Sequence, residues 1–372
     1  MKFFYCLLTV LLGGVLLVGC GKKSDHMEAV KSKLNSDGSY YLLADQTMLG
    51  SQLEFMLDRI DPAMQKLLKD NNIPFTYAEL RKKLEQGCKI AGLDQIKAYG
   101  ASSIVLSGGK NNQPYFFHNR WTMVFGGEKL PAFMLPFSGK KIAFADFAAQ
   151  VPDNVVSAGI MPVNLAELYK FLKAGKYLPE NSETMLRSYL ECDPEKFLSG
   201  ISGEVLCMMF EPVAAQPQLI YIINDQDNRL FKLCGKYLLF DADKLAEYKF
   251  PATDIEVVIR KKVNKLQVFI GNGVAAGYDR KIAAKQTMGQ RAELTAHCAT
   301  LPMEANGFGI SCYFNTAGKA AGKLANVSAM LTDNSSVTLY YNSYCDWNGF
   351  PFEVFANVIP ELENLINMAK NN

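Results

Sequence analysis

Residues 203–225 read GEVLCMMFEPVAAQPQLIYIIND, and this stretch decides the fold class. Two apolar runs, at 203–211 and 219–223, flank a turn with two prolines, which is the pattern of an antiparallel hairpin. Asn224 and Asp225 follow, and beyond them apolar residues recur at helical spacing. Because an Asp or Asn side chain accepts hydrogen bonds from the first free amides of a helix, the stretch predicts a hairpin that runs directly into a helix.

The same junction of an apolar strand with a helix occurs at three further places. In each case an Asp or Asn follows the strand: Asp45 after residues 39–44, Asn164 after 155–161 and Asn315 after 308–314. The helix after Asn315 is expected to consist of small residues, through Gly318, Ala321 and Leu324. Four occurrences of one junction indicate a repeated strand–helix unit.

A second unit has the order helix, strand, turn, strand. It occurs first as a helix at 77–91, a strand at 98–107, a turn at 108–112 and a strand at 115–125. It occurs again as a helix at 183–198, a strand at 203–211, a turn at 212–217 and a strand at 219–223. Antiparallel hairpins with separate helices indicate the α+β class, with antiparallel sheets and packed helices. We predict two diverged repeats, residues 39–150 and 151–300, and a shortened C-terminal strand–helix unit, residues 301–372, that packs on the repeats and ends in a helix at 352–368.

This order of elements, together with the strand start at Gly203 and Glu204, resembles a family of exported bacterial proteins of unknown function. The likeness covers about two thirds of the body of the chain and includes no catalytic motif. It implies a secreted protein with duplicated α+β units.

The N-terminus has the pattern of an export signal. Lys2 precedes residues 3–18, a run without charge that is shorter than the roughly 20 residues of a membrane-spanning helix. The run closes with Leu-Val-Gly-Cys at 17–20, which resembles the lipobox of bacterial prolipoproteins. The resemblance implies a signal peptide at residues 1–19, a diacylglycerol on the thiol of Cys20 and membrane anchoring through that lipid. Residues 20–38 are then a polar tether, and Gly21 in place of an aspartate favours the outer membrane, on its periplasmic or surface face, over the inner membrane.

Composition excludes several classes of function. The 372 residues have a formal charge of only +2, which lacks the basic field that nucleic-acid binding requires. Only three histidines occur, at 26, 118 and 297, and no Cys-x-x-Cys interval is present, so we expect no metal site and no cofactor. Seven cysteines remain in the mature body, and Cys312 with Cys345 is the candidate disulfide.

Catalytic and binding motifs are sparse. Nucleophile-elbow, Walker and dinucleotide motifs are absent, and we predict no catalytic residue. The adjacent His297 and Cys298 are interpreted as a loop histidine beside a packed cysteine, and His118 as a half-exposed strand residue. An aromatic cluster that includes Tyr340 and Tyr341 gives the one binding hint. Rings among amides can stack on sugars, and the candidate glycan-stacking residues are Tyr344, Trp347 and Phe350.

These features favour a lipid-anchored cell-envelope protein that is a non-enzymatic binding or scaffolding module for an envelope protein or a glycan. Two alternatives remain open: an envelope hydrolase that acts on glycan or peptide, and a carrier of an apolar ligand. Convergent carboxylates in a cleft, or His297 close to Cys298, favour an enzyme. A cavity lined wholly by Phe and Met favours a carrier.

Overall fold

The computed structural model describes most of the chain between residues 25 and 345. The described ranges are 25–35, 39–46, 76–107, 115–127, 129–213, 216–250, 254–291, 300–314 and 320–345, with single positions at 62–70 and 294–298. Cys20, the leader and the predicted helix at 352–368 lie outside these residues. The middle of the expected tether forms helix α2 (Asp25–Lys33).

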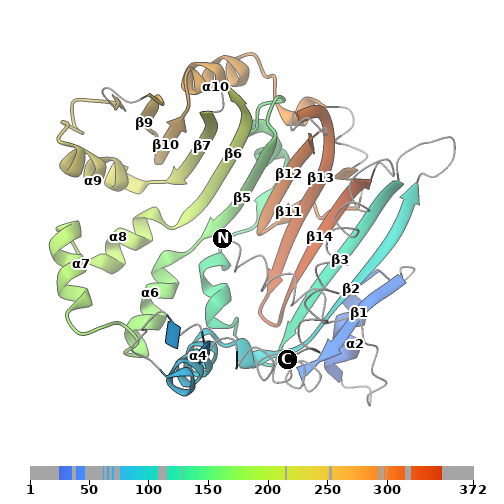
Figure 1. Cartoon of the computed structure of the whole chain (residues 1–372). Helices are drawn as coiled ribbons and strands as arrows, with labels where there is room; N and C mark the ends of the chain where they lie inside the picture. Colours follow the sequence, from blue (N-terminus) through green and yellow to red (C-terminus); the bar gives the residue numbers. More distant parts are fainter. Residues whose placement is uncertain are drawn as a thin grey trace.

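One antiparallel sheet of twelve strands dominates the described part of the chain (Figure 1). Together with its packed helices it confirms the α+β class. The strands, in their order across the sheet, are β1 (Ser39–Asp45), β2 (Ile96–Ser107), β3 (Tyr115–Phe125), β14 (Ser336–Cys345), β13 (Ala320–Asp333), β12 (Gly307–Phe314), β5 (Ser157–Val163), β6 (Gly203–Val213), β7 (Gln216–Asn224), β10 (Lys265–Ile270), β9 (Val257–Lys262) and β8 (Glu247–Lys249). A separate two-stranded sheet pairs β4 (Ile142–Ala143) with β11 (Glu304–Ala305).

The two halves of the large sheet share one strand order. In the first half the sheet runs β1-β2-β3-β14-β13-β12, and in the second it runs β5-β6-β7-β10-β9-β8. Each half therefore places its first three strands in chain order and its last three in reverse order. All strands of the second half belong to one continuous segment between β3 and β12. The predicted division into two repeats and a third unit stays a prediction, because strand order alone does not establish a duplication.

Two of the four predicted caps are observed, at Asn164 and Asp225, and the helix expected after Asp45 lies outside the described residues. The helices of the body are α4 (Tyr77–Ala91), α5 (Phe144–Gln150), α6 (Leu165–Ala174), α7 (Ser182–Leu190), α8 (Pro194–Ile201), α9 (Arg229–Leu238) and α10 (Val274–Ala283). Asn164 Oδ1 accepts from the Glu167 amide at 3.2 Å, which confirms the predicted cap of α6. The single helix expected at 183–198 is two helices, because Asp193 caps α8 and a proline opens it.

The prediction of a helix after Asn315 is wrong. Residues 320–324 belong to β13, and Leu324 pairs with Cys312 of β12. Small residues such as Ala and Gly fit a strand as well as a helix when two neighbouring strands offer hydrogen bonds, so pairing with β12 and β14 prevails over local propensity.

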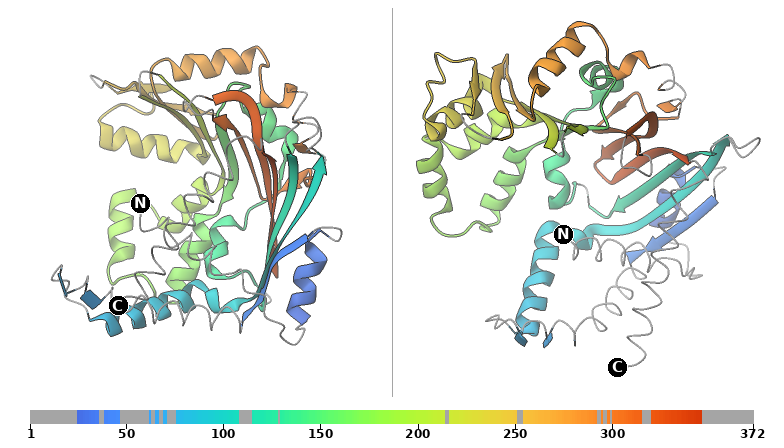
Figure 2. Two further views of the ribbon diagram at one scale, coloured as in Figure 1. Left: turned by 45° about the vertical axis from the view of Figure 1, so that its right-hand side comes forward. Right: turned by 45° about the horizontal axis from the view of Figure 1, so that its top comes forward.

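Both faces of the second half of the sheet are covered (Figures 1 and 2). The main core lies on one face, where Phe147 of α5 stacks on Phe308 at 6.0 Å between ring centroids and Ile220 of β7 is fully buried. Successive strand residues point to opposite faces. Helix α9 packs Phe231 against Leu266 on the other face.

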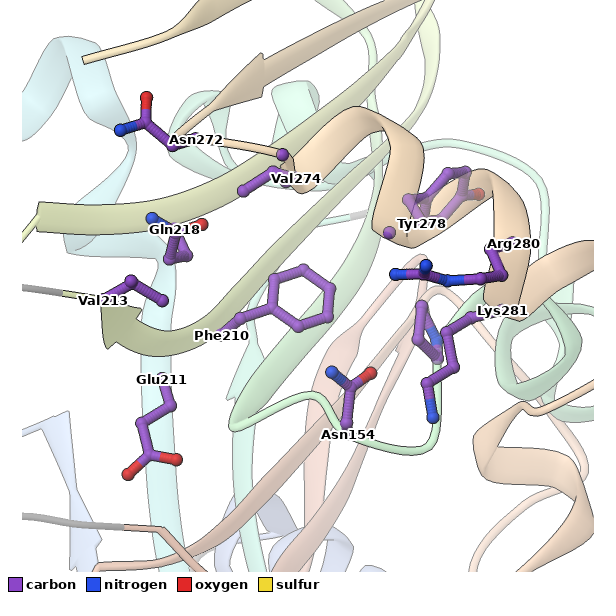
Figure 3. A pocket seen from close by; sticks show the side chains of 13 residues that line it. Asn154, Phe210, Glu211, Val213, Gln218, Asn272, Val274, Tyr278, Arg280 and Lys281 are labelled. Carbon is purple, nitrogen blue, oxygen red and sulfur yellow. The ribbon is translucent and has the colours of Figure 1, made fainter. Parts of the chain in front are cut away.

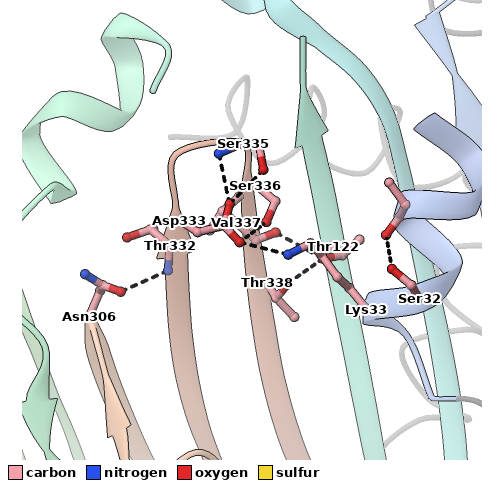
Figure 4. A network of polar contacts seen from close by, with 11 residues as sticks. Ser32, Lys33, Thr122, Asn306, Thr332, Asp333, Ser335, Ser336, Val337 and Thr338 are labelled. Carbon is pink, nitrogen blue, oxygen red and sulfur yellow. Dashed lines mark hydrogen bonds and ion pairs between the residues drawn. The ribbon is translucent and has the colours of Figure 1, made fainter. Parts of the chain in front are cut away.

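Helix α2 is fixed to the first half by a polar network (Figure 4). Lys33 Nζ lies 2.8 Å from Asp333 Oδ2 in the turn between β13 and β14, and Asp333 also accepts from the Ser335 amide and the Ser336 hydroxyl. Burial alone raises the pKa of the Asp333 carboxyl, but these donors and the Lys33 charge hold that pKa well below its ordinary value. Val30 on the apolar side of α2 is fully buried.

Candidate functional site

A hollow of about 370 Å³ lies at the end of β6 and β7, beside α10 (Figure 3). Its volume is near the lower end of the range of about 300–1,000 Å³ that is typical of ligand pockets. Three parts of the chain line it: the β6–β7 hairpin, the turn at 152–154 before β5, and the segment from Asn272 to Lys281 that contains α10. All three belong to the second half of the sheet.

Gln218 is the most unusual side chain of this hollow. It lies on the core-facing side of β7, two residues before Ile220, and only 4% of it is exposed. Its Nε2 finds no hydrogen-bond acceptor among the residues that the structure describes. A buried donor without a partner costs about 1–3 kcal/mol. Among the described residues that line the hollow, only Gln218 has a buried polar atom of this kind.

The place of the Gln218 amide depends on a glycine. Gly271 has a φ of +119°, and a Cβ there would lie 2.6 Å from the amide carbon of Gln218. Any side chain at this position would strain the backbone and displace the amide. The loop between β10 and α10 therefore holds Gln218 against the wall of the hollow.

Charged groups lie on the rim. Arg280 of α10 is exposed and makes no ion pair with any residue in the described ranges, whereas its neighbour Lys281 pairs with Asp153 at 2.9 Å. The Arg280 guanidinium and the Asn154 amide extend toward the ring of Phe210, and the Glu211 carboxylate extends away from it (Figure 3). The centre of the hollow thus faces donors and a cation rather than a carboxylate.

The apolar part of the lining comes from Phe210, Val274 and Tyr278. Phe210 is half-buried and lies at the centre of the view in Figure 3. Burial, and secondarily the charge of Asp279, raises the pKa of Tyr278 to about 12, so its hydroxyl remains protonated at neutral pH. One aromatic face among amides and a guanidinium suits a ligand that has both an apolar side and polar edges.

His118 is buried rather than half-exposed, which corrects the interpretation from the sequence. Its Nδ1 donates to Asn342 Oδ1 at 2.5 Å, and its Nε2 accepts from Arg120 Nε at 3.2 Å. Asn342 also donates to the backbone oxygen of His297 and to Thr300. Burial lowers the pKa of His118, Asn342 opposes this and Arg120 reinforces it. The histidine joins β3, β14 and the 297–300 segment, and only 2% of it is exposed.

Burial raises the thiol pKa of three described cysteines, Cys207, Cys234 and Cys298. Burial raises the pKa of the Cys298 thiol to about 12, so it is not a thiolate at neutral pH. Cys312 is buried, and its Sγ lies 3.3 Å from the Val155 oxygen. The expected disulfide to Cys345 is therefore wrong, because β13 lies between the strands that carry the two residues.

The predicted site residues are not those of the hollow. Tyr344 lies in β14, while Trp347, Phe350 and Cys20 are outside the described residues. Gln218 and Arg280 were missed because a polar residue in a hairpin and a charge on a helix are ordinary surface features. The pair of glycines around Asn272 was the only sequence signal of an unusual backbone beside the hollow.

Comparison with protein-family models, with curated proteins and with solved structures finds no match for this chain. Within the described ranges, no group of three or more His, Cys, Asp or Glu side chains is placed to hold a metal ion. None of the helices in these ranges has the length and apolar character needed to span a bilayer.

Proposed function

We propose that this chain is a lipid-anchored protein of the bacterial cell envelope and a non-enzymatic binding module, with the hollow beside α10 as its binding site. The lipobox-like end of the leader at Cys20 supports the location. The single observation that carries the binding role is the buried amide of Gln218, which has a donor without a partner in the described structure at the wall of the hollow. A ligand oxygen would relieve its cost.

The lining of the hollow favours binding over the two alternatives. A hydrolase of glycan or peptide needs two carboxylates or a nucleophile with a base. Of the described residues that line the hollow, Glu211 is the one carboxylate, and none is a histidine or a cysteine. A carrier of an apolar ligand needs an apolar cavity, whereas this lining includes Asn154, Gln218 and Arg280.

The location is tested at Cys20. In the native host, the wild-type protein should sediment with membranes, and mass spectrometry of its N-terminus should show an acylated cysteine. Cys20→Ser should release the protein into the soluble periplasmic fraction, because the acyl chains supply the anchor. Continued membrane association of this variant would contradict the anchor.

The binding role is tested through stability. Gln218→Met keeps the volume of the side chain and removes the unpartnered donor, so it should raise the free energy of unfolding by about 1–2 kcal/mol. Gln216 is the matched control on the same strand, because its Nε2 donates to the Asp254 oxygen at 3.1 Å and its Oε1 accepts from Asn272 at 3.2 Å. Gln216→Met should lower stability. If both variants lower it, Gln218 has a structural role and the hollow loses its main support.

A further inference from the structure

We infer that the hollow beside α10 binds a sugar that carries a carboxylate. This rests on the proposed function, since a protein held in the envelope is exposed to the saccharides of that compartment. Three groups of the hollow carry the inference: the guanidinium of Arg280, the amide of Gln218 and the ring of Phe210.

The guanidinium selects the carboxylate. Arg260, which packs over Phe269 nearby, is bound by Glu247 at 2.7 Å and by Asp279 at 2.9 Å, so its fork is occupied. Arg280 has no such carboxylate within the described part of the chain and extends over the hollow (Figure 3). A guanidinium presents donors in a planar fork that matches a carboxylate in two parallel hydrogen bonds. We therefore infer that a carboxylate of the ligand pairs with Arg280.

The Gln218 amide selects oxygen. Both hydrogens of its Nε2 are donors, and the group is buried without an acceptor in the described structure. Hydroxyl, ring and acetamido oxygens of a sugar are acceptors of this kind. The amide of Asn154 extends toward the Phe210 ring of the same hollow (Figure 3). A purely apolar acid would leave the Gln218 donor unpaired and would gain nothing from it.

The Phe210 ring selects a flat, partly apolar ligand. The C–H faces of a pyranose lie flat on aromatic rings, while its edges carry hydroxyls. A hollow of about 370 Å³ has room for one or two such rings and not for a longer chain. Glu211 does not oppose the acid, because its carboxylate extends away from Phe210.

The test uses three probes on the purified mature protein: N-acetylmuramic acid, N-acetylglucosamine and acetate. The first two differ in one substituent, a 3-O-lactyl ether that carries the carboxylate in place of a hydroxyl, and the third supplies a carboxylate without a ring. Calorimetric titration should show saturable binding of N-acetylmuramic acid with a dissociation constant below about 1 mM. The dissociation constant of each other probe should be higher by about tenfold or more. Equal binding of N-acetylglucosamine would overturn the role of the acid. Equal binding of acetate would overturn the role of the ring.

Variants test whether the sugar binds in the hollow. Arg280→Gln should reduce the affinity for N-acetylmuramic acid to that for N-acetylglucosamine, and Gln218→Met should weaken both sugars by about tenfold. Lys285→Gln removes an exposed charge just beyond α10, and Gln267→Met removes another buried amide with an unpartnered atom that does not line the hollow. Both should leave the affinities within about twofold. Failure of all three probes to bind would overturn the inference, whereas the acylation of Cys20 is decided by the separate fractionation experiment.

Discussion

Asp225 should be one of the most costly single side chains to remove from the second half of the sheet. It is fully buried at the end of β7. Its Oδ1 accepts from the Leu230 amide at 2.7 Å, and its Oδ2 accepts from the Phe231 amide at 3.1 Å. Asp225→Ala leaves both amides unpaired at about 1–3 kcal/mol each, so the expected loss is about 2–6 kcal/mol. Asn164→Ala, which removes one half-exposed cap bond of α6, should cost about 1 kcal/mol.

The assay is urea unfolding of both variants and of Asp225→Asn, with the free energy taken from the midpoint and slope. Burial raises the pKa of Asp225, while the backbone amides of Leu230 and Phe231 act in the opposite direction. The ionised carboxylate is thus partly penalised, and the neutral amide of Asp225→Asn should cost less than Asp225→Ala. Equal losses for Asp225→Ala and Asn164→Ala would refute the reasoning, because two buried acceptor bonds would then be worth no more than one half-exposed cap.

Three further outcomes follow from burial. The melting temperature should fall as the pH drops below about 6.5, because His118 then binds a proton in the unfolded chain but not in the folded protein, where its pKa is lowered. His118→Gln should show a smaller dependence of the melting temperature on pH. The same dependence in the wild type and in this variant would contradict the prediction. Phe147→Ala should cost about 3–5 kcal/mol in urea unfolding and the exposed Val263→Ala less than about 0.5 kcal/mol. Iodoacetamide at pH 8 should label the exposed Cys192 and spare Cys298, and rapid labelling of Cys298 in peptide maps would show that it is not buried.

Local patterns predicted much of the secondary structure. The strand at 115–125 and the helix at 77–91 have the predicted bounds, because alternation and capping are short-range properties of the sequence. The segment after Asn315 shows that local patterns do not predict every element. Its small residues carry no strong preference, and the strand there exists because β12 and β14 pair with it.

The candidate site could not be predicted from the sequence. Asn154, Gln218 and Arg280 are separated along the chain by 64 and 62 residues in turn. Only the packing of α10 across the ends of β6 and β7 brings them to one hollow. Burial of an amide without a partner is likewise a property of tertiary structure, since hairpin turns commonly carry glutamine on an exposed edge.

The nested order of strands also has a consequence for folding. In the first half β3 must pair with β14, and the Asn119 side chain donates to the Tyr341 oxygen across 222 residues of chain. In the second half Ser157 pairs with Met209. A roughly fourfold longer loop adds about 1 kcal/mol of closure entropy, and local contacts also form faster. A fragment of residues 140–291, which keeps α5 and β5–β10 together and loses the cover of Phe308, should therefore fold cooperatively, although less stably than the whole chain. Circular dichroism during urea titration would show a sigmoidal transition. A fragment without such a transition would mean that the second half depends on β12, and that the sheet folds as one unit in spite of its strand order.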